Sequence, residues 1–252
     1  MINIRSKREI ELLREAGYIN YLTHQEIKKH IRVGVTTNEL DKIAEKFIKS
    51  HGGYPSCLGY EGYPKSICVS INDEVVHGIP SNRKLRNGDI VSIDFCVELN
   101  GYQSDSANTY IVGNTSKEVE ELVNNTEKAL YIGLSQIKAG AKIGDIGNAI
   151  ETFAHEHNLG VVEELVGHGV GTSIHEDPDV PNYGQKGTGI TLKEGMVIAV
   201  EPMLNLGTKH VGMLDDDWTI VTEDGQPSAH FEHTVVVTKD GYEILTGDKN
   251  NV

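Results

Sequence analysis

The sequence is short of several residue types, and each shortage excludes a class of protein. Only three cysteines occur among 252 residues, at Cys57, Cys68 and Cys96. Their number is odd, and no pair has the spacing of a zinc site or a redox motif. We therefore exclude a disulfide-stapled secreted domain and expect a reducing compartment, the cytoplasm.

Basic residues, membrane-spanning runs and linker segments are scarce or missing as well. Lys and Arg number 23 against 37 Asp and Glu, and the formal net charge of −14 argues against a nonspecific grip on nucleic acid. No apolar run reaches the length that crosses a bilayer. Residues 1–17 show helical periodicity, unlike a signal peptide. Without a Pro-, Gly- or Ser-rich linker, we expect residues 1–252 to form a single domain.

What the sequence does contain is an internal repeat. The pattern Leu-x-x-Gly, five residues and then an acid runs from Leu85 to Asp94 and again, 107 residues later, from Leu192 to Glu201. The residues before each acid are mostly apolar, which predicts a buried strand that ends in a carboxylate. An unpaired buried carboxylate is very unfavourable. Two related ones therefore suggest a shared cation.

The repeat extends upstream of these strands. Gly34, Leu40, Phe47 and His51 have counterparts 106 residues later at Gly140, Ile146, Phe153 and His157. Each half thus predicts a glycine turn, an amphipathic helix and an acid-terminated strand. We expect two halves, roughly 10–113 and 117–246, packed about an approximate two-fold axis with a site where they meet. Chance similarity of ordinary helix-turn-strand units is the alternative, and the constant offset argues against it.

A predicted hairpin brings two acidic residues together. Asn100-Gly101 is a strong signal for a tight turn between antiparallel strands, and Asp94 and Asp105 stand on either side of it. Most neighbours of Asp94 are apolar, so we interpret it as a functional residue shielded from solvent. Turn stabilisation is the usual role of a lone aspartate near a turn.

His168 is framed by glycines in the run Val166–Gly171. Glycines let a backbone bend sharply and approach other groups closely, which favours a positioned ligand. A phosphate-binding loop is the rival interpretation, but the spacing is not that of a dinucleotide fingerprint. His175 does not begin a zincin helix, because no histidine follows four residues later and Pro178 would break the helix.

Two more carboxylates stand at predicted strand edges. Glu201 precedes Pro202, which favours an extended backbone, and Glu232 leads into a run of strand-forming residues. Taken singly, each could be paired with a Lys or Arg.

The four carboxylates and His168 together form a ligand set for two divalent cations. Oxygen donors with a single nitrogen suit Mn, Fe, Co or Zn. Four negative charges would also balance two dications. A hydroxide that bridges two such metals near neutral pH predicts a hydrolase.

At these residues the chain resembles the type I methionine aminopeptidases, in the short bacterial form without an N-terminal extension. The resemblance covers nearly the whole chain and rests on the motifs Asn72–Pro80, Gly167–Gly171, Glu201–Met203 and Glu232–Thr234. It implies an α+β pita-bread fold. In that fold a mostly antiparallel curved sheet carries helices on its outer face, and the halves are related by a pseudo-two-fold axis.

The resemblance also implies a role for each ligand. Asp94 would chelate one metal. Asp105 and Glu232 would bridge both, and His168 with Glu201 would complete the second.

Two histidines are implied to act without binding metal. His77 and His175 would hydrogen-bond the substrate amide and the tetrahedral intermediate, and imidazole donors suit developing oxyanion charge. Glu201 would pass the proton of the nucleophile to the departing amine.

The methionine side chain is implied to lie in a pocket of sulfur and aromatic side chains, made by Cys57, Tyr60, Tyr63, Cys68, His77 and Trp218. Sulfur–aromatic contact favours a thioether, although such residues are more often plain core. Three positions depart from the bacterial pattern: Ile174 where Phe is common, Cys96 where Thr is common and His230 where Gln is common. Ile174 bears on pocket shape and on the rate with longer peptides.

The implied activity is removal of the initiator methionine from nascent chains whose second residue is small. We expect a monomer whose partners are nascent N-termini. Docking on the ribosome fits the task, but no basic patch marks it. Asp215–Asp217 looks like a solvated turn.

Three alternatives remain. An X-Pro aminopeptidase or prolidase would keep the ligands, but those enzymes resemble a longer chain with an additional N-terminal domain. A non-catalytic binding protein of this fold would have lost its metals, whereas every ligand is present. A cysteine hydrolase using Cys57 or Cys68 with His77 would leave the carboxylates unexplained.

Overall fold

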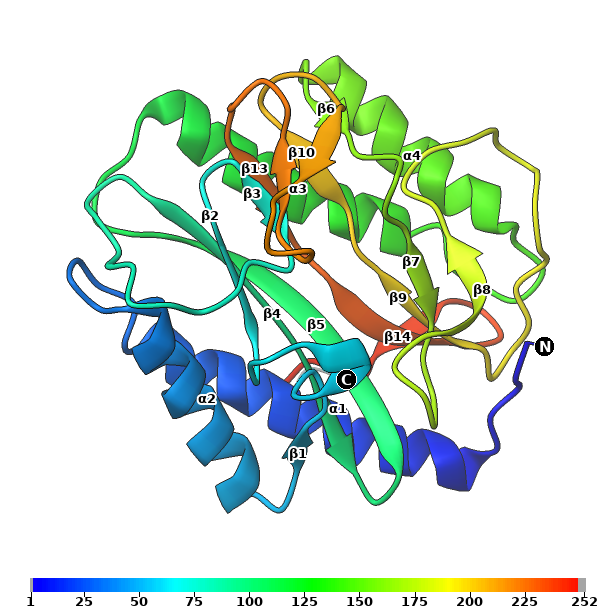
Figure 1. The fold of residues 1–252 in the computed structure, drawn as a ribbon. Coiled ribbons are helices and arrows are strands. Elements are labelled where there is room, and N and C mark those ends of the chain that lie inside the picture. Colours follow the sequence, from blue (N-terminus) through cyan, green and yellow to red (C-terminus); the bar gives the residue numbers. More distant parts are fainter. Residues whose placement is uncertain (1, 249–252) are drawn as a thin grey trace.

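A computed structural model describes residues 2–248, and Figure 1 shows how its elements are arranged. The helices are α1 (Lys7–Lys28), α2 (Thr37–Ser50), α3 (Lys117–Leu134) and α4 (Ile143–Glu156), with a short 3₁₀ turn η1 (Tyr60–Gly62). The strands up to α3 are β1 (Tyr54–Pro55), β2 (Cys68–Ile71), β3 (Glu74–Val76), β4 (Ile90–Leu99) and β5 (Tyr102–Ile111). Those after α4 are β6 (Gly160–Val161), β7 (Gly167–Gly169), β8 (Glu176–Val180), β9 (Val197–Val200), β10 (Met203–Asn205), β11 (Val211–Met213), β12 (Ile220–Thr222), β13 (Ser228–His230), β14 (His233–Val237) and β15 (Tyr242–Ile244).

Two antiparallel strand pairs form the middle of the molecule. β4 pairs with β5 along its whole length, and β9 pairs with β14. In Figure 1 the blue α1 and α2 lie outside β4 and β5, while the green α3 and α4 lie on the side of β9 and its neighbours. Every strand pairing recorded within residues 2–248 is antiparallel. The predicted α+β class is confirmed.

Local signals in the sequence explain these elements. α1 and α2 each begin with a capping box, Ser6 with Glu9 and Thr36 with Glu39, which satisfies free backbone N–H groups at the helix start. The β4–β5 hairpin turns at Asn100 and Gly101, whose φ angles of 54° and 82° are those of a type I′ turn.

The apolar core lies between the helices and the outer face of the strands. One cluster joins α2, β2 and β4, and the largest joins α3, α4 and β9. Burying each such aliphatic side chain contributes roughly 1.5–3 kcal/mol. Successive side chains of a strand point to opposite faces, so the residues between the core-facing ones point to the inner face, where the polar groups lie. No helix within residues 2–248 is long and apolar enough to span a membrane.

The two halves repeat the same helix ending. α2 and α4 have 14 residues each, and in both the C-cap residue that follows is a histidine. Nδ1 of His51 lies 2.9 Å from the carbonyl oxygen of Phe47, and Nδ1 of His157 lies 2.9 Å from that of Phe153. In each pair the ring centroids are 4.2 Å apart.

The glycine turns before these helices match as well. Gly34 N–H donates to Leu85 O at 2.8 Å, and Gly140 N–H donates to Leu192 O at 2.9 Å. Both glycines have a left-handed backbone, with φ of 88° and 92°. The two related halves of the predicted fold are thus confirmed, whereas the limits 10–113 and 117–246 stay a prediction.

Two local predictions were wrong in detail. Asp94 does not end its strand, because β4 continues to Leu99 and its pairing with β5 holds it in the middle. His168 lies on strand β7 and not in a sharply bent loop. The predicted close approach to other groups is confirmed, because a Cβ on Gly167 would lie 2.4 Å from the carbonyl oxygen of Ala199.

Candidate metal centre and substrate pocket

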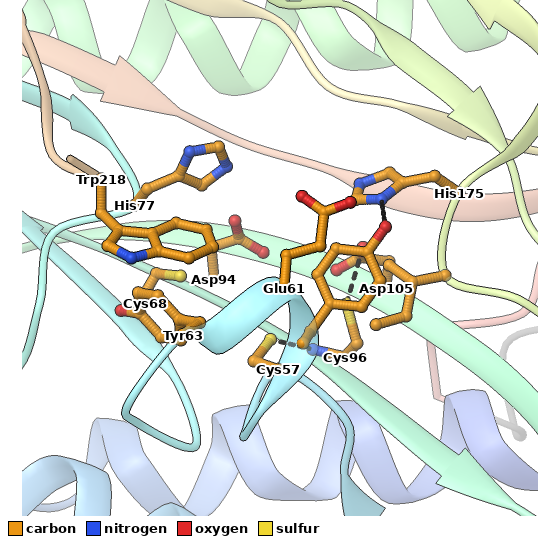
Figure 2. Close-up of a pocket in the computed structure, with 12 residues that line it drawn as sticks. Cys57, Glu61, Tyr63, Cys68, His77, Asp94, Cys96, Asp105, His175 and Trp218 are labelled. Atoms are coloured by element: carbon orange, nitrogen blue, oxygen red, sulfur yellow. Dashed lines mark hydrogen bonds between the residues drawn. The ribbon is translucent and has the colours of Figure 1, made fainter. Parts of the chain in front are cut away.

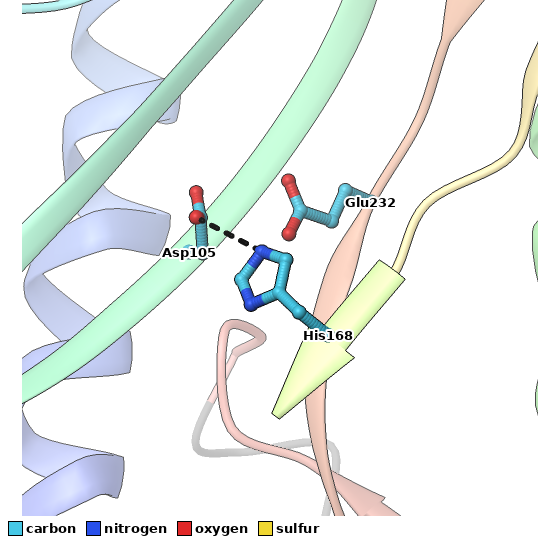
Figure 3. Close-up of side chains that lie close together, drawn as sticks. All are labelled: Asp105, His168 and Glu232. Atoms are coloured by element: carbon cyan, nitrogen blue, oxygen red, sulfur yellow. Dashed lines mark ion pairs between the residues drawn. The ribbon is translucent and has the colours of Figure 1, made fainter. Parts of the chain in front are cut away.

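Four carboxylates and one imidazole face one another where the two halves meet. Asp94 and Asp105 come from the β4–β5 hairpin, and His168 comes from β7. Glu201 follows β9 directly, and Glu232 immediately precedes β14. The closest group is Asp105, His168 and Glu232, whose ligand atoms lie within 4.8 Å of one another (Figure 3).

His168 lies between the other side chains of this cluster. Its Nε2 lies 3.8 Å from Oδ2 of Asp105 and 3.4 Å from Oε1 of Glu201. Its Nδ1 lies 2.9 Å from the carbonyl oxygen of Gly169. When Nδ1 carries the proton and donates to that oxygen, Nε2 has no proton and its lone pair is free. A neutral imidazole oriented in this way is suited to bind a metal ion, because the hydrogen bond at Nδ1 holds the ring in place.

Burial shifts the titration of every group in the cluster. It raises the pKa of Asp94, Glu201 and Glu232 well above their ordinary values and that of Asp105 to about 7. Burial also lowers the pKa of His168 to about 4. These carboxyl groups can ionise together out of water only if a cation compensates their charge.

The donor set fits divalent metal ions. Oδ1 of Asp105 and Oε1 of Glu232 are buried and have no hydrogen-bond partner within the described part of the chain. Among residues 2–248, neither of the two cavities that meet here is lined by a Lys or Arg that could neutralise them. Buried oxygens without a donor are suited to coordinate cations.

Hydroxyl groups fix the backbone beneath the ligands. The Thr234 side chain accepts from Asp105 N at 3.0 Å and donates to Asp105 O at 2.7 Å. Thr109 makes the same pair of bonds, at 2.9 and 2.8 Å, to the backbone of His230. Glu232 N–H donates to Ala107 O at 2.9 Å, which ties the two halves together beside the ligands.

A cavity next to the cluster is lined by sulfur and aromatic groups (Figure 2). All the residues predicted to contact substrate line it: Cys57, Tyr60, Tyr63, Cys68, His77, His175 and Trp218. Tyr63 and Trp218 meet edge to face with ring centroids 5.0 Å apart. Ile174 also lines the cavity and is 6% exposed, so its side chain forms part of the pocket wall.

Tyr60 orients one of the two non-ligand histidines. Its hydroxyl lies 2.8 Å from Nδ1 of His175. Burial raises the pKa of Tyr60, so its hydroxyl keeps the proton and donates it to Nδ1. A neutral His175 then carries its own proton on Nε2, where it can donate a hydrogen bond. Burial lowers the pKa of His175 and favours this neutral form.

The three cysteines are free thiols in the same cavity. Cys96 Sγ donates to Oδ2 of Asp105 at 2.9 Å, so this departure from the bacterial pattern supports a predicted ligand. A hydrogen bond from Cys68 lowers the pKa of the Cys57 thiol. No hydrogen bond to His77 is recorded for either thiol within residues 2–248, so the pairing that a cysteine hydrolase needs is not observed.

Sequence reasoning missed several contributors. Thr234 and Asn182 support ligands through the backbone, Asn182 by donating to Glu201 O at 3.0 Å. Their partners are distant in sequence, so no local pattern could reveal them. Glu61 lines the cavity as well, and the glycines on either side of Tyr60-Glu61 were the available signal for a tight turn there.

Comparison with known proteins defines the class. Residues 11–239 match the model of metallopeptidase family M24. The chain is 52% identical to methionine aminopeptidase 1 of Bacillus subtilis over 246 residues, 98% of this chain and 99% of that protein. Crystal structures of methionine aminopeptidases from Rickettsia prowazekii and Thermotoga maritima superpose with TM-scores of 0.97, at 45% and 41% identity. The match covers 98% of this chain and 100% of each of those chains.

The chain therefore belongs to metallopeptidase family M24. It has the pita-bread fold of these relatives, as predicted. Within the family it belongs to the type I methionine aminopeptidases of bacteria, and the identities favour this assignment over an X-Pro peptidase.

Proposed function

We propose that this protein removes N-terminal methionine from newly made polypeptides whose second residue is small, using two divalent metal ions. The observation that carries the proposal is the set of buried, unneutralised carboxylates around His168, beside a sulfur-lined cavity. Mn, Fe, Co or Zn would suit these donors, and availability would decide among them.

Each ligand has a proposed place. Asp94 would chelate one ion, Asp105 and Glu232 would lie between both, and His168 with Glu201 would complete the second site. When bound, the two cations would act as Lewis acids and generate a hydroxide nucleophile near neutral pH.

The chain's own residues would move protons and stabilise charge. Glu201 would take the proton from the nucleophile and return it to the leaving amine. His175 and His77 would donate hydrogen bonds to the scissile amide and to the oxyanion that develops from it. His77 has a left-handed backbone with φ of 59°, an uncommon conformation for a residue with a side chain, and this holds its imidazole at the cavity wall.

The cavity would set specificity by shape. Tyr63, Cys68 and Trp218 form a soft, aromatic wall that suits a thioether. A crowded approach beyond it would exclude large second residues by steric clash. We further propose a monomeric cytoplasmic enzyme of protein maturation whose partners are nascent N-termini, with ribosome docking as an accompanying expectation. The three free thiols are consistent with a reducing compartment.

The test is methionine release from Met-Ala-Ser by chelator-stripped protein, with and without Mn²⁺ or Co²⁺, beside Met-Leu-Ser. We expect release only from Met-Ala-Ser and only with metal. Calorimetric titration should find two ions per chain, and His168→Ala should weaken one of them. Metal-independent release would revive the cysteine mechanism, and no release with any metal would indicate a binding protein.

A further inference from the structure

Glu61 occupies an unusual backbone conformation at the edge of the cavity. Its φ and ψ are 47° and 22°, in the left-handed region that residues with a side chain rarely adopt. Gly59 and Gly62, at φ of 86° and 93°, make the tight turn around it. Such a conformation is energetically unfavourable for a residue that has a side chain. A glycine would avoid that cost, so a glutamate at this position indicates a role for its side chain.

The Glu61 carboxylate is directed into the cavity and is unpaired. Glu61 is exposed, lines the cavity and has no recorded ion pair or hydrogen bond within residues 2–248. Figure 2 shows its carboxylate beside the His175 ring, on the side of the cavity away from Trp218. Glu61 also acts on His175 electrostatically. Burial lowers the pKa of His175, and the negative charge of Glu61 raises it by a smaller amount.

Its position relative to a substrate follows from the proposed function, on which this inference rests. The methionine side chain would lie against Tyr63, Cys68 and Trp218, and the scissile amide would lie near His175. The remaining polypeptide would then leave the cavity past Glu61. The second residue must be small, so the third is the first that can carry a charge.

We propose that Glu61 determines specificity for the charge of the third substrate residue and favours Lys or Arg there. Four ligand carboxylates would be balanced by two dications, which leaves Glu61 as the negative charge at the cavity edge. An ammonium or guanidinium group would gain an ion pair with it, whereas a carboxylate would be repelled. For a pair that stays partly hydrated, the preference is roughly fivefold.

The experiment compares kcat/KM for Met-Ala-Lys-Ala, Met-Ala-Gln-Ala and Met-Ala-Glu-Ala with the metal-loaded enzyme. The wild type should cleave the lysine peptide roughly fivefold faster than the glutamate peptide in low salt. Glu61→Gln should bring the ratio close to one, and Glu61→Lys should invert it. Glu156→Gln, an exposed glutamate at the end of α4, is the matched control and should keep the wild-type ratio.

Salt provides a test without any substitution. The Debye screening length is about 3 Å in 1 M salt. The wild-type ratio of kcat/KM for the lysine and glutamate peptides should therefore fall towards one as salt is added. Equal rates for the three peptides in low salt, or a preference that survives in Glu61→Gln, would overturn the charge proposal while methionine release still supports the aminopeptidase. Failure to cleave any of the peptides would overturn the aminopeptidase function and this proposal with it.

Discussion

At the scale of single residues, Tyr60 connects the substrate cavity to the proposed chemistry. It lines the cavity and also holds Nδ1 of His175. Without that hydroxyl the imidazole could carry its proton on either nitrogen. Only one of the two tautomers can donate from Nε2.

We predict that Tyr60→Phe lowers kcat about tenfold, because losing one hydrogen bond that orients a catalytic imidazole is worth about 1.4 kcal/mol. KM for Met-Ala-Ser should change little, since the aromatic ring remains. Steady-state kinetics with saturating metal is the measurement. Tyr54→Phe, which removes a hydroxyl that donates to Leu58 O on the neighbouring segment, is the control and should be silent. An unchanged kcat in Tyr60→Phe would remove Tyr60 from the mechanism.

At the scale of secondary-structure elements, two threonine side chains join the halves. Thr234 on β14 holds the backbone of Asp105 on β5, and Thr109 on β5 holds that of His230 on β13. Each hydroxyl replaces a ladder bond that the strands cannot make directly. The predicted ligand Asp105 thus lies where side-chain hydrogen bonds join the two halves.

We predict that Thr234→Val destabilises the protein by about 2 kcal/mol, because it leaves a buried N–H and a buried carbonyl of Asp105 without partners. Thr234→Ser keeps the hydroxyl and should cost much less. Urea unfolding of the metal-free proteins measures the difference. Weakened metal binding in Thr234→Val alone would show that the same bonds position Asp105, and equal stability of the two variants would contradict the role.

Elements with local signals could be predicted from the sequence, and the convergence of the site could be predicted only in part. Asn100-Gly101 fixed the hairpin and hence the proximity of Asp94 and Asp105. The repeat related Asp94 to Glu201. Nothing local could place Glu232 against Ala107 or Tyr60 against His175, because those contacts join residues more than 100 positions apart.

Asp94 and Glu61 show where pattern reading failed. Asp94 was predicted to end its strand, but the apolar run continues beyond it and β4 extends to Leu99. Glu61 was overlooked because an exposed glutamate is normally solvated surface.

At the scale of the whole molecule, the cluster of four carboxyl groups opposes folding when no cation compensates their charge. Four acidic groups must either ionise close together or take up protons when the chain folds. Ligands that bind only the folded state stabilise it by mass action.

We predict that chelation lowers the melting temperature and that Mn²⁺ restores it, with about 2.7 kcal/mol gained per site at a hundredfold excess over Kd. Glu201→Gln removes one of the like charges, so it should raise the stability of the chelated protein and reduce the gain from Mn²⁺. Calorimetric scans of both proteins in each condition measure this. A melting temperature that ignores both chelator and metal would argue against a metal centre here.

Buried histidines predict how stability depends on pH. Burial lowers the pKa of His24 to about 3 and that of His233 to about 4, from an ordinary value of 6.5. The unfolded chain therefore binds more protons below pH 6.5. Stability from these neutral imidazoles is complete above pH 6.5 and is lost as the pH falls towards 4 and 3.

We predict that His24→Gln removes about 2 kcal/mol of the stability lost between pH 7 and pH 5, because one buried imidazole no longer has to be kept neutral. Urea unfolding at both pH values measures the slope. His155→Gln, at an exposed position on α4, should leave the slope unchanged. A His24→Gln slope equal to that of the wild type would show that other groups drive acid unfolding.

The packing of α1 against residues 243–245 affects the order in which the chain can fold during synthesis. A Cβ on Gly17 would lie 2.2 Å from the carbonyl oxygen of Leu245, and Arg14 bonds Glu243 through two nitrogens at 2.7 and 3.1 Å. α1 therefore completes its packing only after residues 243–245 have been translated. An emerging chain can build the β4–β5 hairpin before then, but this face of α1 stays uncovered until β15 has been made.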